Sequence, residues 1–122
     1  MIVQAPMAGG PSTPALAAAV SEAGGFGFVA AGYISAAALR DQIAETRAIT
    51  SRPFGVNIFF PSPAPAPQEA IAGYAELIAP MATAAGVELG TPRFEDDQFD
   101  DKLQVVLETR PAAVAIGAMS SA

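Results

Sequence analysis

The fold is decided by a short apolar stretch, Phe54-Gly55-Val56-Asn57-Ile58-Phe59. A proline precedes it and a proline-rich loop follows it, so the stretch predicts a buried strand. Side chains alternate between the two faces of a strand, which places Phe54, Val56 and Ile58 on one face and Asn57 on the other. We expect the first face to pack against helices and Asn57 to point inward, near the carboxyl end of the strand.

Working outward from this strand, apolar runs predict two earlier strands, at residues 2–5 and 26–30, and a later one at 112–116. Helices are expected between them. The first begins after the N-cap Thr13 and buries Leu16 and Val20, the second begins after Ser35 and buries Leu39 and Ile43, and two more span about 68–85 and 96–109. Alternating strands and helices indicate an α/β fold with about four parallel strands. The spacing suits barrel units, and an open α/β sheet remains the alternative.

Length and composition limit what this chain can be. Its 122 residues suit one domain, and a complete (β/α)8 barrel needs about 250. A formal net charge of −6 disfavours binding to nucleic acid or to an anionic membrane surface. Short apolar runs and an N-terminus without a basic leader favour a cytoplasmic protein. The chain has no Cys and no His, so neither a disulfide nor a histidine base is available.

Three motifs suggest functions that their contexts disfavour. Gly25-Phe26-Gly27-Phe28-Val29-Ala30 matches a dinucleotide-binding pattern, but here a helix precedes the glycines and a strand follows them, which is the reverse of a Rossmann unit. The acidic residues from Glu95 to Asp101 are typical of a first helical turn, and we expect no metal there. The four prolines between Pro61 and Pro67 could form a peptide ligand, and we prefer a stiff loop joining a strand to a helix.

Two places carry candidate site residues. Ala5-Pro6-Met7 lies where the first strand ends, at the edge where (β/α)8 enzymes place their chemistry, and an ordinary tight turn explains it equally well. Asn57 is the only Asn in the chain. A buried amide costs free energy unless it is hydrogen-bonded, so Asn57 contacts either a ligand or a neighbouring loop.

The chain resembles the nitronate monooxygenase family in several segments. The similarity begins with Ile2-Val3-Gln4-Ala5-Pro6-Met7-Ala8-Gly9-Gly10, and it includes residues 16–21, 23–25 and 30–32, Arg52-Pro53-Phe54-Gly55-Val56-Asn57 and the acidic stretch from Pro92 to Asp97. Flavin-dependent enoyl-reductases share much of the opening. The resemblance implies the N-terminal half of a (β/α)8 TIM barrel, with residues 1–122 forming one partial domain.

The resemblance also implies a cofactor and a reaction. FMN would be bound at the strand ends by Ala5, Pro6, Met7 and Asn57, and the substrates would be an alkyl nitronate and O2, giving a carbonyl compound and nitrite. The family's catalytic His and phosphate-binding loops come after the point where residue 122 would align, so we expect a fragment with half a flavin site and no catalytic residue of its own.

Three alternatives remain at this point: a non-catalytic remnant that binds flavin weakly, a related enoyl-reductase-like barrel, and an unrelated open α/β binding module. Half a barrel also leaves sheet edges unpaired, and we therefore expect the chain to self-associate or to pack loosely.

Overall fold

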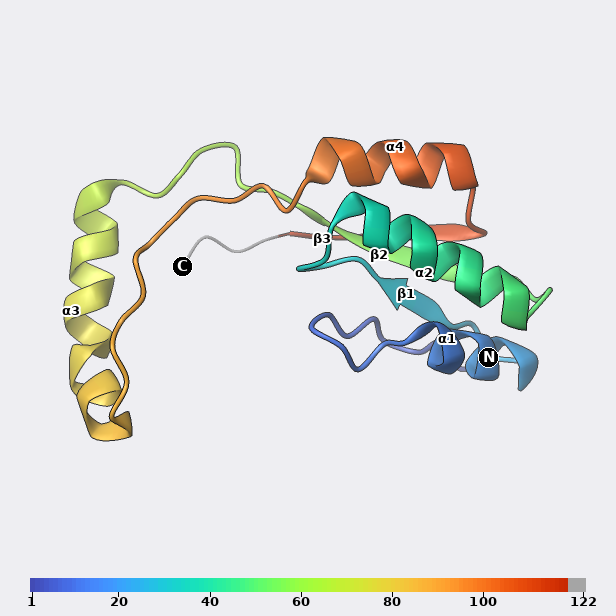
Figure 1. The fold of residues 1–122 in the computed structure, drawn as a ribbon, viewed down its shortest axis with the longest axis horizontal. Coiled ribbons are helices and arrows are strands. Elements are labelled where there is room, and N and C mark those ends of the chain that lie inside the picture. The colour runs from blue at the N-terminus through green and yellow to red at the C-terminus, as the bar shows by residue number, and fades with distance from the viewer. Residues whose placement is uncertain (119–122) are drawn as a thin grey trace. The chain divides into compact units, whose positions relative to one another are not determined.

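A three-stranded parallel sheet with the order β1-β2-β3 forms the centre of the structure, a computed structural model that describes residues 1–118 (Figure 1). The strands are β1 (Phe28–Ala30), β2 (Gly55–Phe60) and β3 (Ala113–Ala118). The helices are α1 (Pro14–Glu22), α2 (Ala36–Ile49), α3 (Gln68–Ala85) and α4 (Phe99–Thr109). The predicted α/β class with parallel strands is confirmed, and the sheet is consistent with the N-terminal portion of a barrel.

The expected first strand is reduced to a single bridge. Val3 pairs in parallel with Phe26, and Phe26 donates its N–H to the Ile2 carbonyl oxygen at 2.9 Å. The next contact is made by a side chain. Gln4 Oε1 accepts the Phe28 N–H at 3.0 Å, where a regular strand would use a main-chain carbonyl oxygen. The prediction of a regular strand at 2–5 was therefore wrong, and the predicted strand at 26–30 shortens to β1 for the same reason.

The predicted helix starts are confirmed at α1 and α2, and the buried face of α1 differs from the prediction. Thr13 and Ser35 each accept a backbone N–H through the side-chain oxygen, as N-caps do. On α1 the fully buried residues include Ala17 and Ala18, whereas Leu16 and Val20 are only half-buried. A Cβ on Gly27 would lie 2.0 Å from the Ala17 carbonyl oxygen. Helix and strand backbones approach so closely here that only small side chains fit between them.

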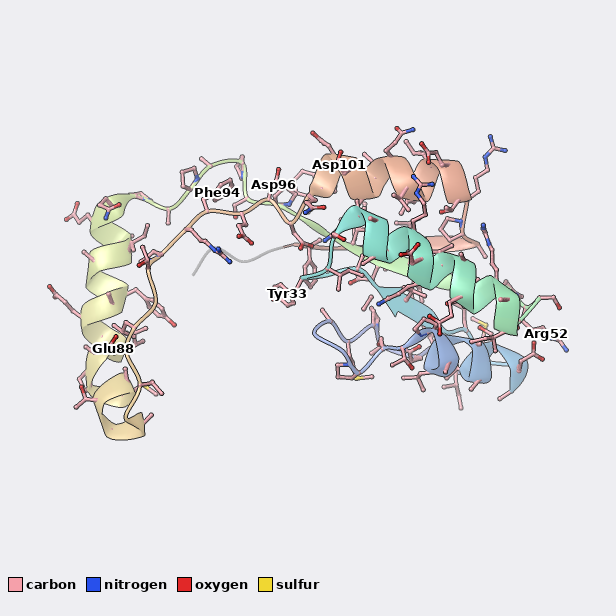
Figure 2. The ribbon with its side chains drawn as sticks, viewed as in Figure 1. Tyr33, Arg52, Glu88, Phe94, Asp96 and Asp101 are labelled. Carbon is pink, nitrogen blue, oxygen red and sulfur yellow. The ribbon has the colours of Figure 1, made fainter. Side chains whose placement is uncertain are left out.

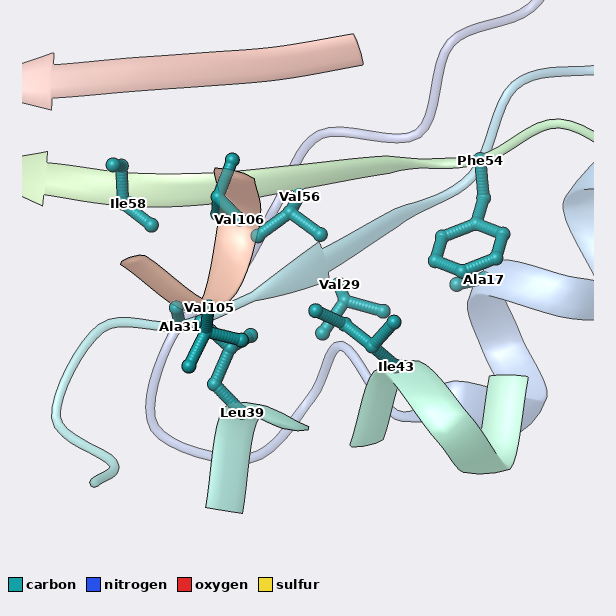
Figure 3. Packing of buried hydrophobic residues seen from close by; sticks show 10 residues of the cluster. All are labelled: Ala17, Val29, Ala31, Leu39, Ile43, Phe54, Val56, Ile58, Val105 and Val106. Carbon is teal, nitrogen blue, oxygen red and sulfur yellow. The ribbon is translucent and has the colours of Figure 1, made fainter. Parts of the chain in front are cut away.

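The main core lies between the sheet and the helices α2 and α4 (Figure 3). Phe54, Val56 and Ile58 are at most 5% exposed, which confirms that this face packs against helices. Leu39 and Ile43 of α2 are buried as expected. On α4 the buried residues are Lys102, Val105 and Val106, whereas Leu107 is exposed.

The described chain divides into two compact units. The first contains residues 1–61 and 96–118, and with them the whole sheet. The second contains residues 62–95 and therefore α3, which has the bounds that the sequence predicted and no buried residue. No helix among residues 1–118 is long and apolar enough to cross a membrane.

Candidate functional site

The predicted site residues lie around the segment that follows β1. The Ala31 N–H donates to the Asn57 carbonyl oxygen at 2.9 Å. A Cβ on the next residue, Gly32, would lie 2.2 Å from the Phe59 ring and 2.9 Å from the Ala8 side chain. The Asn57 main chain therefore contacts Ala31, just after the last residue of β1, and Ala8, which follows Ala5, Pro6 and Met7, lies beside Gly32.

Asn57 is 7% exposed, and its side chain makes one hydrogen bond among residues 1–118. Its Nδ2 donates to the Ala115 carbonyl oxygen of the neighbouring strand at 3.1 Å. The sequence left two roles open for Asn57, a ligand contact and a structural hydrogen bond. The structural hydrogen bond is present. Within residues 1–118 the amide oxygen of Asn57 accepts no hydrogen bond. It remains available to a donor group of a ligand, and contact with a flavin stays a prediction.

The turn at residues 5–12 is held by two polar side chains that sequence reasoning did not select, Gln4 and Ser12. Ser12 is 5% exposed, and its Oγ accepts hydrogen bonds from Gln4 Nε2 and from the Met7 N–H, both at 2.8 Å. Gly9 and Gly10 have φ angles of +80° and +124°, which favour glycine. Pro6 is half-buried, while Ala5 and Met7 are exposed. The sequence signal that could have identified Gln4 and Ser12 is their position on either side of the turn at Gly9 and Gly10.

A buried ion pair between Lys102 and Asp97 also holds Tyr33, in the segment that follows β1. Lys102 Nζ lies 2.7 Å from Asp97 Oδ2, and the two side chains are 1% and 9% exposed. The other carboxylate oxygen of Asp97 accepts the Tyr33 N–H at 3.0 Å. Tyr33 has a φ of +66°, and its ring meets Phe59 edge-on at 5.6 Å. Asp97 thus holds the backbone of Tyr33, a role that the acidic sequence run alone did not indicate.

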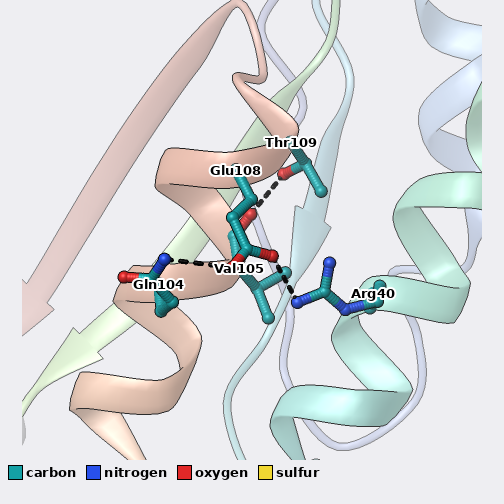
Figure 4. A network of polar contacts seen from close by, with 5 residues as sticks. All are labelled: Arg40, Gln104, Val105, Glu108 and Thr109. Atoms are coloured by element: carbon teal, nitrogen blue, oxygen red, sulfur yellow. Dashed lines mark hydrogen bonds and ion pairs between the residues drawn. The ribbon is translucent and has the colours of Figure 1, made fainter.

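One carboxylate of the helix layer has a displaced pKa. Hydrogen bonds from Gln104 and Arg40, together with the positive charge of Arg40, lower the pKa of Glu108 below its ordinary value of 4.5 (Figure 4). Arg40 Nη2 lies 2.6 Å from Glu108 Oε2, so the ion pair joins α2 to α4. The pair lies on the solvent side of the helices and has a structural role.

Comparison with known proteins gives a family match that covers almost the whole chain. The family model for nitronate monooxygenase matches residues 1–121. The chain belongs to the nitronate monooxygenase family. A nitronate monooxygenase of Pseudomonas aeruginosa is 39% identical over 121 residues, which cover 93% of this chain and 33% of that protein. A nitronate monooxygenase of Paraburkholderia phytofirmans is 55% identical over 65 residues, covering 53% of this chain and 18% of that protein.

Solved structures confirm the fold assignment. A nitroalkane oxidase from Streptomyces ansochromogenes superposes with a TM-score of 0.81 at 48% identity, covering 94% of this chain and 33% of that one. FabK from Thermotoga maritima superposes with a TM-score of 0.63 at 32% identity, covering 97% of this chain and 27% of that one. The chain thus spans about a third or less of each of these relatives.

Proposed function

We propose that this chain provides part of the flavin site of an FMN-dependent oxidoreductase that oxidises alkyl nitronates with O2, giving a carbonyl compound and nitrite. Membership of the nitronate monooxygenase family supports the reaction class. The observation that carries the proposal for the site is that Asn57 contacts Ala31 and that Ala8, which directly follows the turn at residues 5–7, lies beside Gly32, in the segment after the carboxyl end of β1. The carboxyl edge of the sheet is where (β/α)8 enzymes place their active sites.

Small residues at this edge leave backbone open to a flat ring. The Phe59 ring packs against Gly32 and Gly117, whereas a Cβ on Gly9 or Gly10 would meet nothing within 4 Å, so a planar ligand can approach the backbone of this turn closely. The exposed backbone of Ala5 and Met7 and the unpaired amide oxygen of Asn57 offer polar groups to it. Bound FMN would supply the redox chemistry, and these residues would bind and orient the ring.

A second candidate is a flavin-dependent enoyl-reductase-like activity. The superposition on FabK, at 32% identity over 97% of this chain, favours it. The higher TM-score and identity of the nitroalkane oxidase favour the first proposal. A fragment that binds flavin weakly and has no catalysis of its own is the third outcome, because the chain contains no His to act as a base.

Titration of the chain with FMN tests the site. We expect saturable quenching of flavin fluorescence, weakened severalfold by Asn57→Ala. Gln104→Ala removes an amide from the exposed side of α4 and is expected to leave the quenching unchanged. An absence of saturable quenching, or equal quenching in Asn57→Ala, would contradict the flavin site.

Product assays then separate the candidates. Nitrite release from propyl-2-nitronate supports the monooxygenase reaction, and oxidation of NAD(P)H with an enoyl substrate supports the reductase. If flavin binds and neither product appears, the chain is a binding fragment, and the proposed catalysis is wrong for this chain.

A further inference from the structure

A cavity lies at the end of the sheet opposite to the proposed flavin site. It has a volume of about 370 Å³ and is formed by the loop before β2 (residues 50–54), the loop before β3 (residues 110–112) and Arg47 in the last turn of α2. Figure 2 shows Arg52, which lines this cavity, and Tyr33, which follows β1, at opposite ends of the sheet. In (β/α)8 enzymes this amino-terminal edge is not where the chemistry takes place.

The cavity concentrates positive charge in an acidic protein. Lys and Arg number six against twelve Asp and Glu, yet three of the six, Arg47, Arg52 and Arg110, line this one cavity. The other three basic residues each lie within 3.0 Å of a carboxylate, in the pairs Arg40–Glu108, Lys102–Asp97 and Arg93–Glu95. In the cavity the nearest such approach among described residues is 4.0 Å, between Arg52 Nε and Glu22 Oε2.

Of the three guanidinium groups, only that of Arg47 makes a hydrogen bond to another of residues 1–118. Arg47 Nη2 donates to the Thr109 carbonyl oxygen at the end of α4, where a cation offsets the negative end of the helix. Glu22 also accepts a hydrogen bond from the Thr50 hydroxyl, so its carboxylate is shared. The Arg110 guanidinium has no hydrogen bond or ion pair with any of residues 1–118.

Arg110 also occupies a backbone position that suits glycine better. It ends α4 with a φ of +49°, in the left-handed region. Glycine is the usual residue at this place, and a side chain there costs about 1 kcal/mol. Arg110 is thus held, at a cost to stability, in the lining of the same cavity as Arg47 and Arg52. An anionic ligand in the cavity would offset this concentration of positive charge.

We propose that this cavity binds a small organic phosphate. Guanidinium groups match phosphate oxygens with two parallel hydrogen bonds, and three of them suit a doubly charged group. Pro53, Pro111 and Ala112 line the same cavity and offer apolar surface to the organic part of the ligand. The volume is in the range of small-molecule sites. This site is separate from the proposed flavin site, and neither depends on the other.

Calorimetric titration of the full chain with phenyl phosphate and with inorganic phosphate, at constant ionic strength, tests the proposal. We expect saturable binding of both, tighter for phenyl phosphate, and at least a tenfold loss of affinity in Arg52→Ala and in Arg110→Gly. Arg110→Gly is the informative variant, because glycine suits the left-handed backbone. It should unfold at a higher temperature than the parent chain while it binds phosphate less well.

Arg93→Ala is the matched control. It removes one positive charge from an arginine outside the cavity that is paired with Glu95, and it should bind phenyl phosphate like the parent chain. If affinity falls equally in all three variants, the effect is one of net charge and the proposed site is wrong. Absence of saturable binding at millimolar phosphate would overturn the proposal as well.

Discussion

Gly27 shows how a single missing side chain sets the distance between two elements. A Cβ at this position would lie 2.0 Å from the carbonyl oxygen and 2.6 Å from the carbonyl carbon of Ala17, and neither backbone atom can move independently. In the Gly25-Phe26-Gly27 segment, Gly27 therefore serves the close packing of the chain against α1.

Gly27→Ala is expected to destabilise the chain by about 1–3 kcal/mol or more, because α1 must shift away from the sheet. Urea unfolding followed by circular dichroism measures the change. Gly73→Ala is the control, since a Cβ there meets nothing within 4 Å inside α3, and it should increase helix content. Equal stability of Gly27→Ala and the parent chain would show that α1 does not pack as described.

The buried pair of Lys102 and Asp97 gives a second prediction for single residues. Lys102→Met leaves the Asp97 carboxylate with little solvent and no cation, so we expect a loss of about 3–5 kcal/mol in unfolding free energy. The double variant with Asp97→Asn should recover part of the loss, because no charge then remains buried.

Arg93→Met removes an ion pair whose side chains are 80% and 61% exposed, and it should cost less than about 1 kcal/mol. Unfolding by urea compares the three variants. A loss in Lys102→Met no larger than that in Arg93→Met would show that the Lys102–Asp97 pair is solvated.

At the scale of helices and strands, we expect the stability that the Arg40–Glu108 pair gives to the contact between α2 and α4 to depend on pH. The pKa of Glu108 is lowered by folding, so its contribution to stability is present above the unfolded pKa of about 4.5 and is lost as the pH falls through the lower folded value. Glu108→Gln should therefore be less stable than the parent chain at neutral pH, and the difference should disappear in acid.

Thermal unfolding of Glu108→Gln and of the parent chain across this pH range measures the effect. A difference between Glu108→Gln and the parent chain that stays constant with pH would contradict the interpretation.

At the scale of helices and strands, the predictions that were confirmed rest on local sequence patterns. Strand alternation located Phe54, Val56 and Ile58 in the core, and cap residues located the starts of α1 and α2. Contacts between distant segments were missed. The bond from Phe28 N–H to Gln4 and the pairing of Asp97 with Tyr33 join residues that are 24 and 64 positions apart, and no periodic pattern encodes them. For the candidate site, sequence indicated Asn57 and the Met7 turn but not the groups that hold them.

At the scale of the whole molecule, β3 exposes an apolar face. Val114 and Ile116 lie on the same side of this edge strand and are 41% and 61% exposed. An exposed apolar edge strand favours association with another chain. We expect the chain to form oligomers whose fraction rises with concentration, as measured by light scattering after size-exclusion chromatography.

Ile116→Lys should shift that distribution toward monomer. Val87→Lys introduces the same charge at a residue that is also 61% exposed but lies outside the sheet, and it should have a smaller effect. A monomer at every concentration for the unmodified chain would refute the expected association.

The contact between Phe60 and Phe99 has a consequence for how this protein can vary. Their rings meet edge-on at 5.2 Å, where the chain leaves the sheet-containing unit and where it returns. Because the two ends are already held together, the closure entropy of the intervening segment rises by only about 0.6 kcal/mol for each doubling of its length. We therefore expect insertions and deletions between these two rings to be tolerated at little thermodynamic cost, which makes this segment suited to carrying an inserted sequence.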